Sequence, residues 1–188
     1  MWLWKTTRRV KYPCANRQRG CHELFSIEHI PEHHTVCVYG KLKCPFKLNK
    51  NCSWIGFKND LKEHANDTHK ANFHESSFRS VSFVDKIINI ISYFGELFVQ
   101  YKRIRDGRLY SAVQLIGTSG KASKYKCQFT LRAANGIEQI SKMLFVQGYS
   151  EDWETIFNSG KCFCLDEAVV RHFLVQNNLD LTITLYRV

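Results

Sequence analysis

Residues 14–37 read CANRQRGCHELFSIEHIPEHHTVC, and residues 44–69 read CPFKLNKNCSWIGFKNDLKEHANDTH. In each stretch two early and two late cysteine or histidine residues have the spacing of metal ligands, with eleven residues between the early pair and the late pair. The eight are Cys14, Cys21, His33 and Cys37 in the first stretch and Cys44, Cys52, His64 and His69 in the second. Thiolate and imidazole are the ligands that tetrahedral zinc prefers. The sequence therefore predicts two zinc modules.

Both predicted zinc ions are structural, because four protein ligands leave no position open for water or substrate. His33 and Cys37 are four residues apart and share one face of a helix, whereas His64 and His69 require a slightly longer reach or a loosened last turn. His29 and His34 flank His33 and remain alternative ligands, whereas His22 and His74 are interpreted as surface residues. A disulfide module is disfavoured, since five of the eight cysteines lie in this segment, interleaved with histidines. We expect chelation to unfold the segment.

The charge of the chain is +10 and is concentrated on the metal-binding side. Residues 1–70 carry 13 Lys/Arg against 6 Asp/Glu, and the remainder carries 14 against 11. A basic zinc module raises the alternative of a zinc-dependent nucleic-acid-binding protein, whose affinity would fall steeply with salt. The positive charges are scattered, however, and no linker with a recognition helix is visible. Nucleic acid is therefore the less favoured partner.

The N-terminus does not resemble a secretory signal, because the apolar residues of Met1–Lys5 precede Arg8 and Arg9 rather than follow them. The most apolar region, Val81–Tyr101, is interrupted by charged residues and is not expected to cross a membrane. We expect a cytoplasmic or nuclear protein. The predicted organisation is an N-terminal extension at 1–13, the two zinc modules at 14–70 and a larger domain at 78–188.

The larger domain is predicted to be mainly β with a small helical content. Runs rich in β-branched and aromatic residues are separated by turn signals such as Asn135-Gly136. The predicted strands are Leu97–Tyr101, Leu109–Ile116, Tyr125–Arg132, Ile137–Val146 and Leu179–Tyr186. Asp166 is expected to cap a helix from Glu167 to Gln176 that stops at Asn177-Asn178. Several antiparallel strands with one helix predict a β-sandwich.

The chain resembles the seven-in-absentia ubiquitin ligases over nearly its whole length from Tyr12. The metal-ligand spacing resembles their Siah-type zinc fingers. The segments at 113–118 (VQLIGT), 158–166 (NSGKCFCLD) and 178–185 (NLDLTITL) are similar to their substrate-binding domain. The resemblance implies a TRAF-like antiparallel β-sandwich that dimerises. It also implies capture of substrate or adaptor peptides as an added strand at a sheet edge.

The resemblance places the peptide groove at Phe73, Asp85, Ile87, Asn89 and Thr182. The usual groove of the family is more apolar and carries a tryptophan that we do not find at these positions, so a different peptide motif is expected. Ordinary core packing is the alternative role for Phe73 and Ile87.

Ubiquitin transfer in this family requires a RING domain, which needs eight cysteine or histidine ligands. Residues 1–13 contain none, so we expect no ligase activity from this chain alone. The resemblance then implies homodimers, or heterodimers with a RING-containing relative that the chain either assists or inhibits.

An enzymatic alternative would use Cys162 or Cys164 as a nucleophile, activated by His172 and Asp166. Free cysteine is among the most buried residue types, so a structural role is favoured for both and for Cys127.

Overall fold

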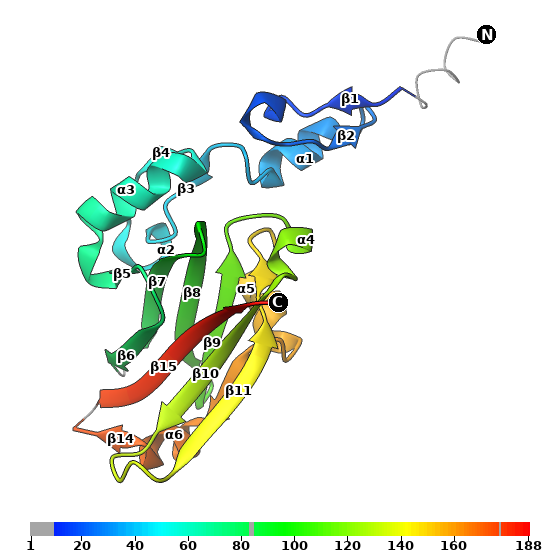
Figure 1. Cartoon of the computed structure of the whole chain (residues 1–188). Helices are drawn as coiled ribbons and strands as arrows, with labels where there is room; N and C mark the ends of the chain where they lie inside the picture. Colours follow the sequence, from blue (N-terminus) through cyan, green and yellow to red (C-terminus); the bar gives the residue numbers. More distant parts are fainter. Residues whose placement is uncertain (1–9, 83–84, 177) are drawn as a thin grey trace.

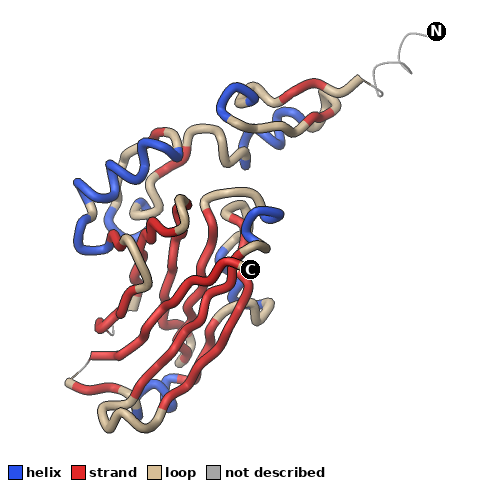
Figure 2. The backbone as a smooth tube through the Cα atoms, in the orientation of Figure 1, coloured by secondary structure: helices blue, strands red, loops and turns tan. Residues whose placement is uncertain are grey.

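The computed structural model describes residues 10–82, 85–176 and 178–188 (Figure 1). Two small modules come first, and a two-sheet β-domain follows. The expectations for Met1–Lys5 and for Asn177 lie outside the described residues. Figure 2 shows that helices are concentrated in the N-terminal part and strands in the β-domain. In the part of the chain that the structure describes, no helix combines the length and apolar character needed to cross a bilayer.

Each module consists of a short hairpin and a helix. We call residues 12–37 module 1 and residues 42–69 module 2. Module 1 is built around β1 (Tyr12–Pro13), a 3-10 turn (Arg17–Arg19), β2 (Leu24–Phe25) and α1 (Ile30–Val36). Module 2 is built around β3 (Leu42–Lys43), α2 (Lys47–Lys50), β4 (Ile55–Gly56) and α3 (Lys58–Thr68). A second 3-10 turn (Lys70–Asn72) leads into the β-domain.

The last ligand candidate of each module directly follows its helix. Cys37 follows α1 in extended conformation, with φ −66° and ψ 113°. His69 follows α3, and its N–H still donates to the Ala65 carbonyl at 2.9 Å. The extra residue between His64 and His69 is therefore accommodated by a loosened last turn, as predicted.

The β-domain is a sandwich of two sheets. The first has the order β11–β10–β15–β14, with β6 also paired to β15. Its strands are β6 (Phe78–Ser82), β10 (Tyr125–Arg132), β11 (Gln139–Phe145), β14 (Leu174–Val175) and β15 (Asn178–Arg187). The second has the order β12–β9–β8–β7–β5, with β13 also paired to β9. Its strands are β5 (Phe73–His74), β7 (Lys86–Tyr93), β8 (Glu96–Arg105), β9 (Arg108–Leu115), β12 (Gln147–Gly148) and β13 (Phe163–Asp166).

The predicted sandwich is confirmed, and its long strand pairs are antiparallel. The short contacts of β5 with β7 and of β12 with β9 are parallel. All five predicted strands are present within a few residues of their expected bounds. The sequence reasoning did not specify β6 or β7, and it missed two short helices of the β-domain, α4 (Ser119–Ala122) and α5 (Trp153–Asn158). The helix predicted after Asp166 is present as α6 (Glu167–His172).

The helix predicted over Glu167–Gln176 is too long. It ends at His172, and Leu174–Val175 form β14 by pairing with Leu179 and Asn178. Asp166 precedes the helix, but its side chain makes no capping hydrogen bond. Its carboxylate instead accepts a hydrogen bond from Arg108 Nε at 2.8 Å. Cross-strand pairing therefore replaces the last predicted turn of this helix.

The main core lies between the two sheets. Alternate residues of β10 and β15, including Phe129 and Ile183, face residues such as Phe98 and Phe163 of the other sheet, and all four are at most 1% exposed. This alternation is the period-two pattern of strands with one buried face. Cys127 is part of this core.

A second core covers the outer face of the six-stranded sheet. The sheet residues in it are Ile88, Ile90, Leu97, Val99, Tyr101, Ala112 and Ile116. Module 2 contributes Leu42, Cys44, Phe46, Leu61 and Ala65, and the α5 region contributes Ile156, Phe157 and Cys162. In Figure 1, module 2 lies against the end of β7 and β8. One face of the sandwich is thus completed by a zinc module.

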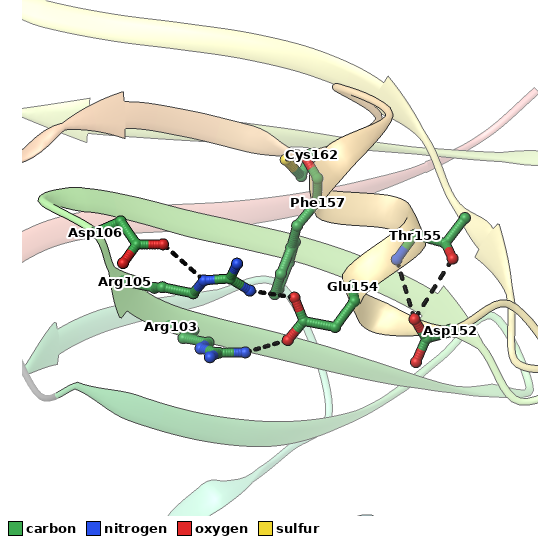
Figure 3. A network of polar contacts seen from close by, with 8 residues as sticks. All are labelled: Arg103, Arg105, Asp106, Asp152, Glu154, Thr155, Phe157 and Cys162. Atoms are coloured by element: carbon green, nitrogen blue, oxygen red, sulfur yellow. Dashed lines mark hydrogen bonds and ion pairs between the residues drawn. The ribbon is translucent and has the colours of Figure 1, made fainter.

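A charged network attaches α5 to β8 (Figure 3). Glu154 accepts hydrogen bonds from Arg103 and from Arg105, the latter at 2.5 Å. Arg105 Nε also donates to Asp106 at 2.8 Å, and Asp152 caps the helix by accepting from Thr155 N at 3.1 Å. These groups are largely solvent-exposed, so their role is to orient α5 rather than to supply much stability.

Candidate zinc sites and their setting

Four side chains of module 1 converge on one point, which we call site 1. The Sγ atoms of Cys14 and Cys37 are 3.8 Å apart, and Cys21 Sγ is 3.4 Å from His33 Nε2. All four ligand atoms lie within 4.8 Å of one another. Gly20, at φ +107°, ends the turn that brings Cys21 back toward Cys14. A left-handed φ of this kind favours glycine.

Site 2 is the corresponding cluster of module 2. Cys44 Sγ is 3.6 Å from His69 Nε2, and Cys52 Sγ is 3.4 Å from His64 Nε2. These four ligand atoms also lie within 4.8 Å of one another. The β3–β4 hairpin supplies the two cysteines and α3 with the residue after it supplies the two histidines, so the four form one compact donor set.

Both clusters have the dimensions of tetrahedral zinc. With Zn–S near 2.3 Å and Zn–N near 2.05 Å, neighbouring ligand atoms should be about 3.8 Å apart for two sulfurs and about 3.6 Å apart for sulfur and nitrogen. The distances between the donor atoms of each site match these values. Sites 1 and 2 could therefore each hold a zinc ion, through three thiolates and one imidazole or through two of each.

The titration of these groups also suits a metal. Burial raises the pKa of Cys21 and of Cys44 to about 12, so that each thiol loses its proton at neutral pH only when a cation replaces it. Burial lowers the pKa of His33, His64 and His69 below the usual value. Neutral imidazole is the form that binds zinc.

Neighbouring groups hold the ligands in place. The backbone N–H of Asn16 donates to Cys14 Sγ at 3.3 Å, and its side-chain amide donates to Cys37 Sγ at 3.5 Å. The ring of Trp54 stacks on His64 with centroids 4.6 Å apart. Such outer contacts orient metal ligands and are part of the design of a metal site.

The other histidines lie away from the donor atoms. His34 Nε2 accepts from the Ala15 backbone N–H at 3.4 Å, and His29 Nδ1 is 2.7 Å from Ser26 Oγ. His22 is exposed, as its reading as a surface residue predicts. The same reading is wrong for His74, which is half-buried, stacks on Phe78 at 4.0 Å and contacts Asn89.

The five candidate peptide-groove positions occupy both sheets. Phe73 lies in β5, opposite Ile90 of β7, and is half-buried; Ile87 and Asn89 lie in β7. Asp85 is exposed just before β7, and its carbonyl accepts from Ile104 N at 2.8 Å. These four are therefore close along one edge.

Thr182 is separate from the other four. It lies in β15 of the five-stranded sheet, between the buried Leu181 and Ile183, so its side chain points to the outer face. Its hydroxyl accepts from Arg132 at 3.1 Å.

A row of buried polar groups, which sequence reasoning missed, underlies the β7 edge. Asn89 Nδ2 donates to Gln100 Oε1 at 2.7 Å, and Gln100 Nε2 donates to Ser111 Oγ at 2.7 Å. Lys102, opposite Ser111 in the register, is fully buried. An alternation of polar residues within a strand normally indicates a solvent-facing side, so the sequence carried a misleading signal here.

The cysteine, histidine and acid of the enzymatic alternative interact with other groups. Cys162 Sγ lies 3.7 Å from the Phe157 carbonyl, His172 Nε2 is 3.2 Å from Glu138, and Asp166 pairs with Arg108. Cys162 and Cys127 are at most 1% exposed, and Cys164 is half-buried. These contacts favour the structural role.

Comparison with known families matches both halves of the chain. Residues 5–83 match the model "Sina, zinc finger", and residues 91–184 match the model "Sina, TRAF-like domain". The chain belongs to the Sina (seven in absentia) family. Its two metal modules correspond to the Sina zinc finger, and its sandwich corresponds to the Sina TRAF-like domain.

Two curated relatives align with almost the whole chain, and a third aligns with part of it. "E3 ubiquitin-protein ligase sina" of Schistosoma mansoni is 22% identical over 197 residues, which is 98% of this chain and 52% of that protein. "E3 ubiquitin-protein ligase siah-1" of Caenorhabditis briggsae is 22% identical over 202 residues, which is 99% of this chain and 46% of that protein. "E3 ubiquitin-protein ligase SINA-like 4" of Arabidopsis thaliana is 35% identical over 60 residues, 31% of this chain and 17% of that protein. This Sina-family chain thus spans about half the length of the first two relatives.

Proposed function

We propose that the chain recognises proteins for ubiquitin ligation, as the zinc-binding and substrate-binding part of a Sina-type system. The observation that carries the proposal is the order of two zinc sites and a TRAF-like sandwich, which matches the Sina models across 5–83 and 91–184. The named relatives are ubiquitin-protein ligases. Site 1 and site 2 hold structural zinc through the eight predicted ligands. The scattered positive charge gives nucleic-acid binding less support.

The edge of β7 is the proposed place of peptide capture. Among the described residues, β7 pairs with β8 along its length, but β5 covers only Ile90 and Ile91 on its other side. The backbone at Lys86–Asn89 is therefore open to an added strand. Strand addition takes its affinity from main-chain hydrogen bonds and its specificity from side-chain pockets. Asp85, Ile87 and Phe73 would line this edge, and the buried amide of Asn89 would support it from below.

A reconstituted ubiquitination reaction tests this function. The chain is added to a RING-containing Sina-family ligase, together with a substrate that the chain binds. We expect the rate of substrate ubiquitination to rise if the chain recruits the substrate to the ligase and to fall if it competes with the ligase. No change in either direction would contradict a role in this pathway. Binding to DNA or RNA that weakens steeply between 50 and 200 mM salt would instead favour the nucleic-acid alternative.

Ile87→Glu should weaken the capture of a selected peptide at least about ten-fold, because a charge beside the open edge must lose water on binding. Ile137→Glu is the matched control, since Ile137 is 84% exposed in the turn between β10 and β11. Affinity can be measured by fluorescence anisotropy, and thermal unfolding confirms that both variants are folded. Equal affinities for the two variants would place the peptide elsewhere.

We also propose that the chain dimerises through β11. In the described structure β11 is the last strand of its sheet, and Met143 and Phe145 are 52% and 53% exposed. A groove of about 620 Å³ beside them is lined in part by Lys126 and Lys161. An exposed edge strand with apolar side chains is a template for pairing with a second copy.

Met143→Glu should raise the dimer dissociation constant at least about ten-fold, because two copies would bring two carboxylates together across the two-fold axis. Light scattering over a concentration series measures the change, with Ile137→Glu again as the control. A monomeric wild-type chain at high micromolar concentration would rule out this dimer.

A further inference from the structure

The two zinc sites differ in what surrounds them. Among the described residues, the apolar cluster around site 1 consists of its own three cysteines with Tyr39 packed against them. Cys44 of site 2, in contrast, belongs to the same cluster as β7, β8 and α5 of the sandwich. Site 1 thus has a small core of its own, and site 2 shares the core of the sandwich.

Apolar contacts join module 2 to the sheet. Phe46 and Leu61 are fully buried, and they share one cluster with Ile88 and Ile90 of β7. Tyr149, which follows β12 in the sandwich, packs against the same cluster. A sandwich side chain thus lies near a ligand of site 2.

Polar contacts join the same two parts. Lys50 Nζ donates to Asn72 Oδ1 at 2.5 Å, and Asn72 Nδ2 donates to Asn89 Oδ1 at 3.1 Å, where the buried amide row begins. On the other side of module 2, Lys58 Nζ lies 2.8 Å from Glu96 of β8. Glu96 is only 12% exposed and also pairs with Lys121. Module 2 is therefore anchored at two separated points.

Module 1 has a looser attachment. Its Arg19 guanidinium lies 4.2 Å above the Phe57 ring of module 2. A cleft of about 370 Å³ separates its ligand loop from Thr118, Ser119 and Ser150 of the sandwich. Another, of about 510 Å³, lies between module 1, the start of α3 and Glu96. Figure 1 shows module 1 extending beyond module 2, away from the sheets. The opening of module 1 therefore breaks few packing contacts with module 2 or with the sandwich.

We propose that site 2 unfolds only with the sandwich, whereas site 1 is an independently opening arm that releases its zinc first. A bound zinc ion stabilises the folded segment that must open before the ion is released. Release from site 2 requires exposure of the shared core, while release from site 1 requires only local opening of residues 14–37. Zinc availability would thereby control the arm while the sandwich and its proposed peptide edge stay intact.

A graded chelator titration of the full, zinc-loaded chain tests the proposal. Released zinc is counted with a colorimetric indicator, and hydrogen exchange is followed by mass spectrometry. We expect two steps of one equivalent each, separated at least about ten-fold in chelator concentration. A ten-fold separation requires only that release from site 2 expose about 60 Å² more apolar surface than release from site 1. In the first step only residues 14–37 should lose protection. Simultaneous release of both ions, or loss of protection in β7–β9 during the first step, would overturn the proposal.

Cobalt substitution identifies which site empties first. Site 1 has three thiolates and site 2 has two, so the first step should remove about three fifths of the thiolate-to-cobalt charge-transfer absorbance. Loss of about two fifths would show that site 2 empties first and would refute the order.

Cys21→Ser and Cys52→Ser are matched variants, since each removes the second cysteine of its site. Cys21→Ser should keep one zinc ion and wild-type protection in β7–β9. Cys52→Ser should lose protection there, or fail to fold. If Cys21→Ser also exposes β7–β9 or fails to fold, the arm is not independent and the proposal is wrong.

Discussion

Replacing Phe46 with alanine should lower the free energy of unfolding of the sandwich by about 3 to 5 kcal/mol, although Phe46 lies in a zinc module. Its ring is fully buried in the core shared with β7 and β8, and its centroid is 4.1 Å from that of His69. The substitution would leave a cavity between module 2 and the sheet and would remove a support of a site 2 ligand. Urea unfolding followed by circular dichroism measures the loss.

Leu48→Ala is the matched control for Phe46→Ala. Leu48 belongs to α2 of the same module but is 52% exposed, so its truncation should change the free energy of unfolding by no more than about 0.5 kcal/mol. A loss below about 1 kcal/mol for Phe46→Ala would show that module 2 and the sandwich unfold separately. A zinc count of both variants separates loss of packing from loss of metal.

The second large effect concerns pH and the buried Lys102. Burial lowers the pKa of this fully buried amine to about 8, from the usual lysine value of 10.5. Between these two values the unfolded chain binds more protons than the folded chain, so the stability of the folded state rises with pH. Below pH 8 the amine is charged in both states, and the cost of burying the charge is fully present.

Stability of the wild type relative to Lys102→Met should therefore increase by roughly 2 kcal/mol between pH 7 and pH 10. Lys102→Met removes the amine but preserves most of the side-chain length, so taking the difference cancels other groups that titrate in both proteins. Urea unfolding at several pH values, with both proteins loaded with zinc beforehand and no free zinc added, gives the comparison. A difference that is flat with pH would show that Lys102 keeps its ordinary pKa.

The zinc sites were predictable because their information is local. The intervals from Cys14 to Cys37 and from Cys44 to His69 contain their own turns and helices, and a ligand set closes within about 25 residues of chain. The loosened turn before His69 followed from one extra residue in the spacing. The strands β10 and β15 were predictable for a similar reason, because alternation along a single strand already indicates which face is buried.

Other features depended on pairing with a neighbouring segment of the chain. The helix after Asp166 was predicted to continue through Leu174, but pairing of Leu174 with Leu179 converts that segment to strand. The row from Asn89 to Ser111 has the polar alternation of a solvent-facing strand, yet these side chains satisfy one another inside the sandwich. Propensity and periodicity describe single segments and carry no information about such partners.

By itself, the sequence determined the zinc chemistry, the mainly β architecture and the resemblance to the Sina family, because ligand spacing and strand alternation are properties of short segments. Only the tertiary structure decided that module 2 shares a core with β7 and β8 while module 1 does not. The ligand spacings of the two modules are nearly the same, so local pattern could not distinguish them. The two modules differ because Phe46 and Leu61 of module 2 are buried against β7 and β8, which come later in the sequence. Contacts between such separate segments are decided only by the tertiary structure.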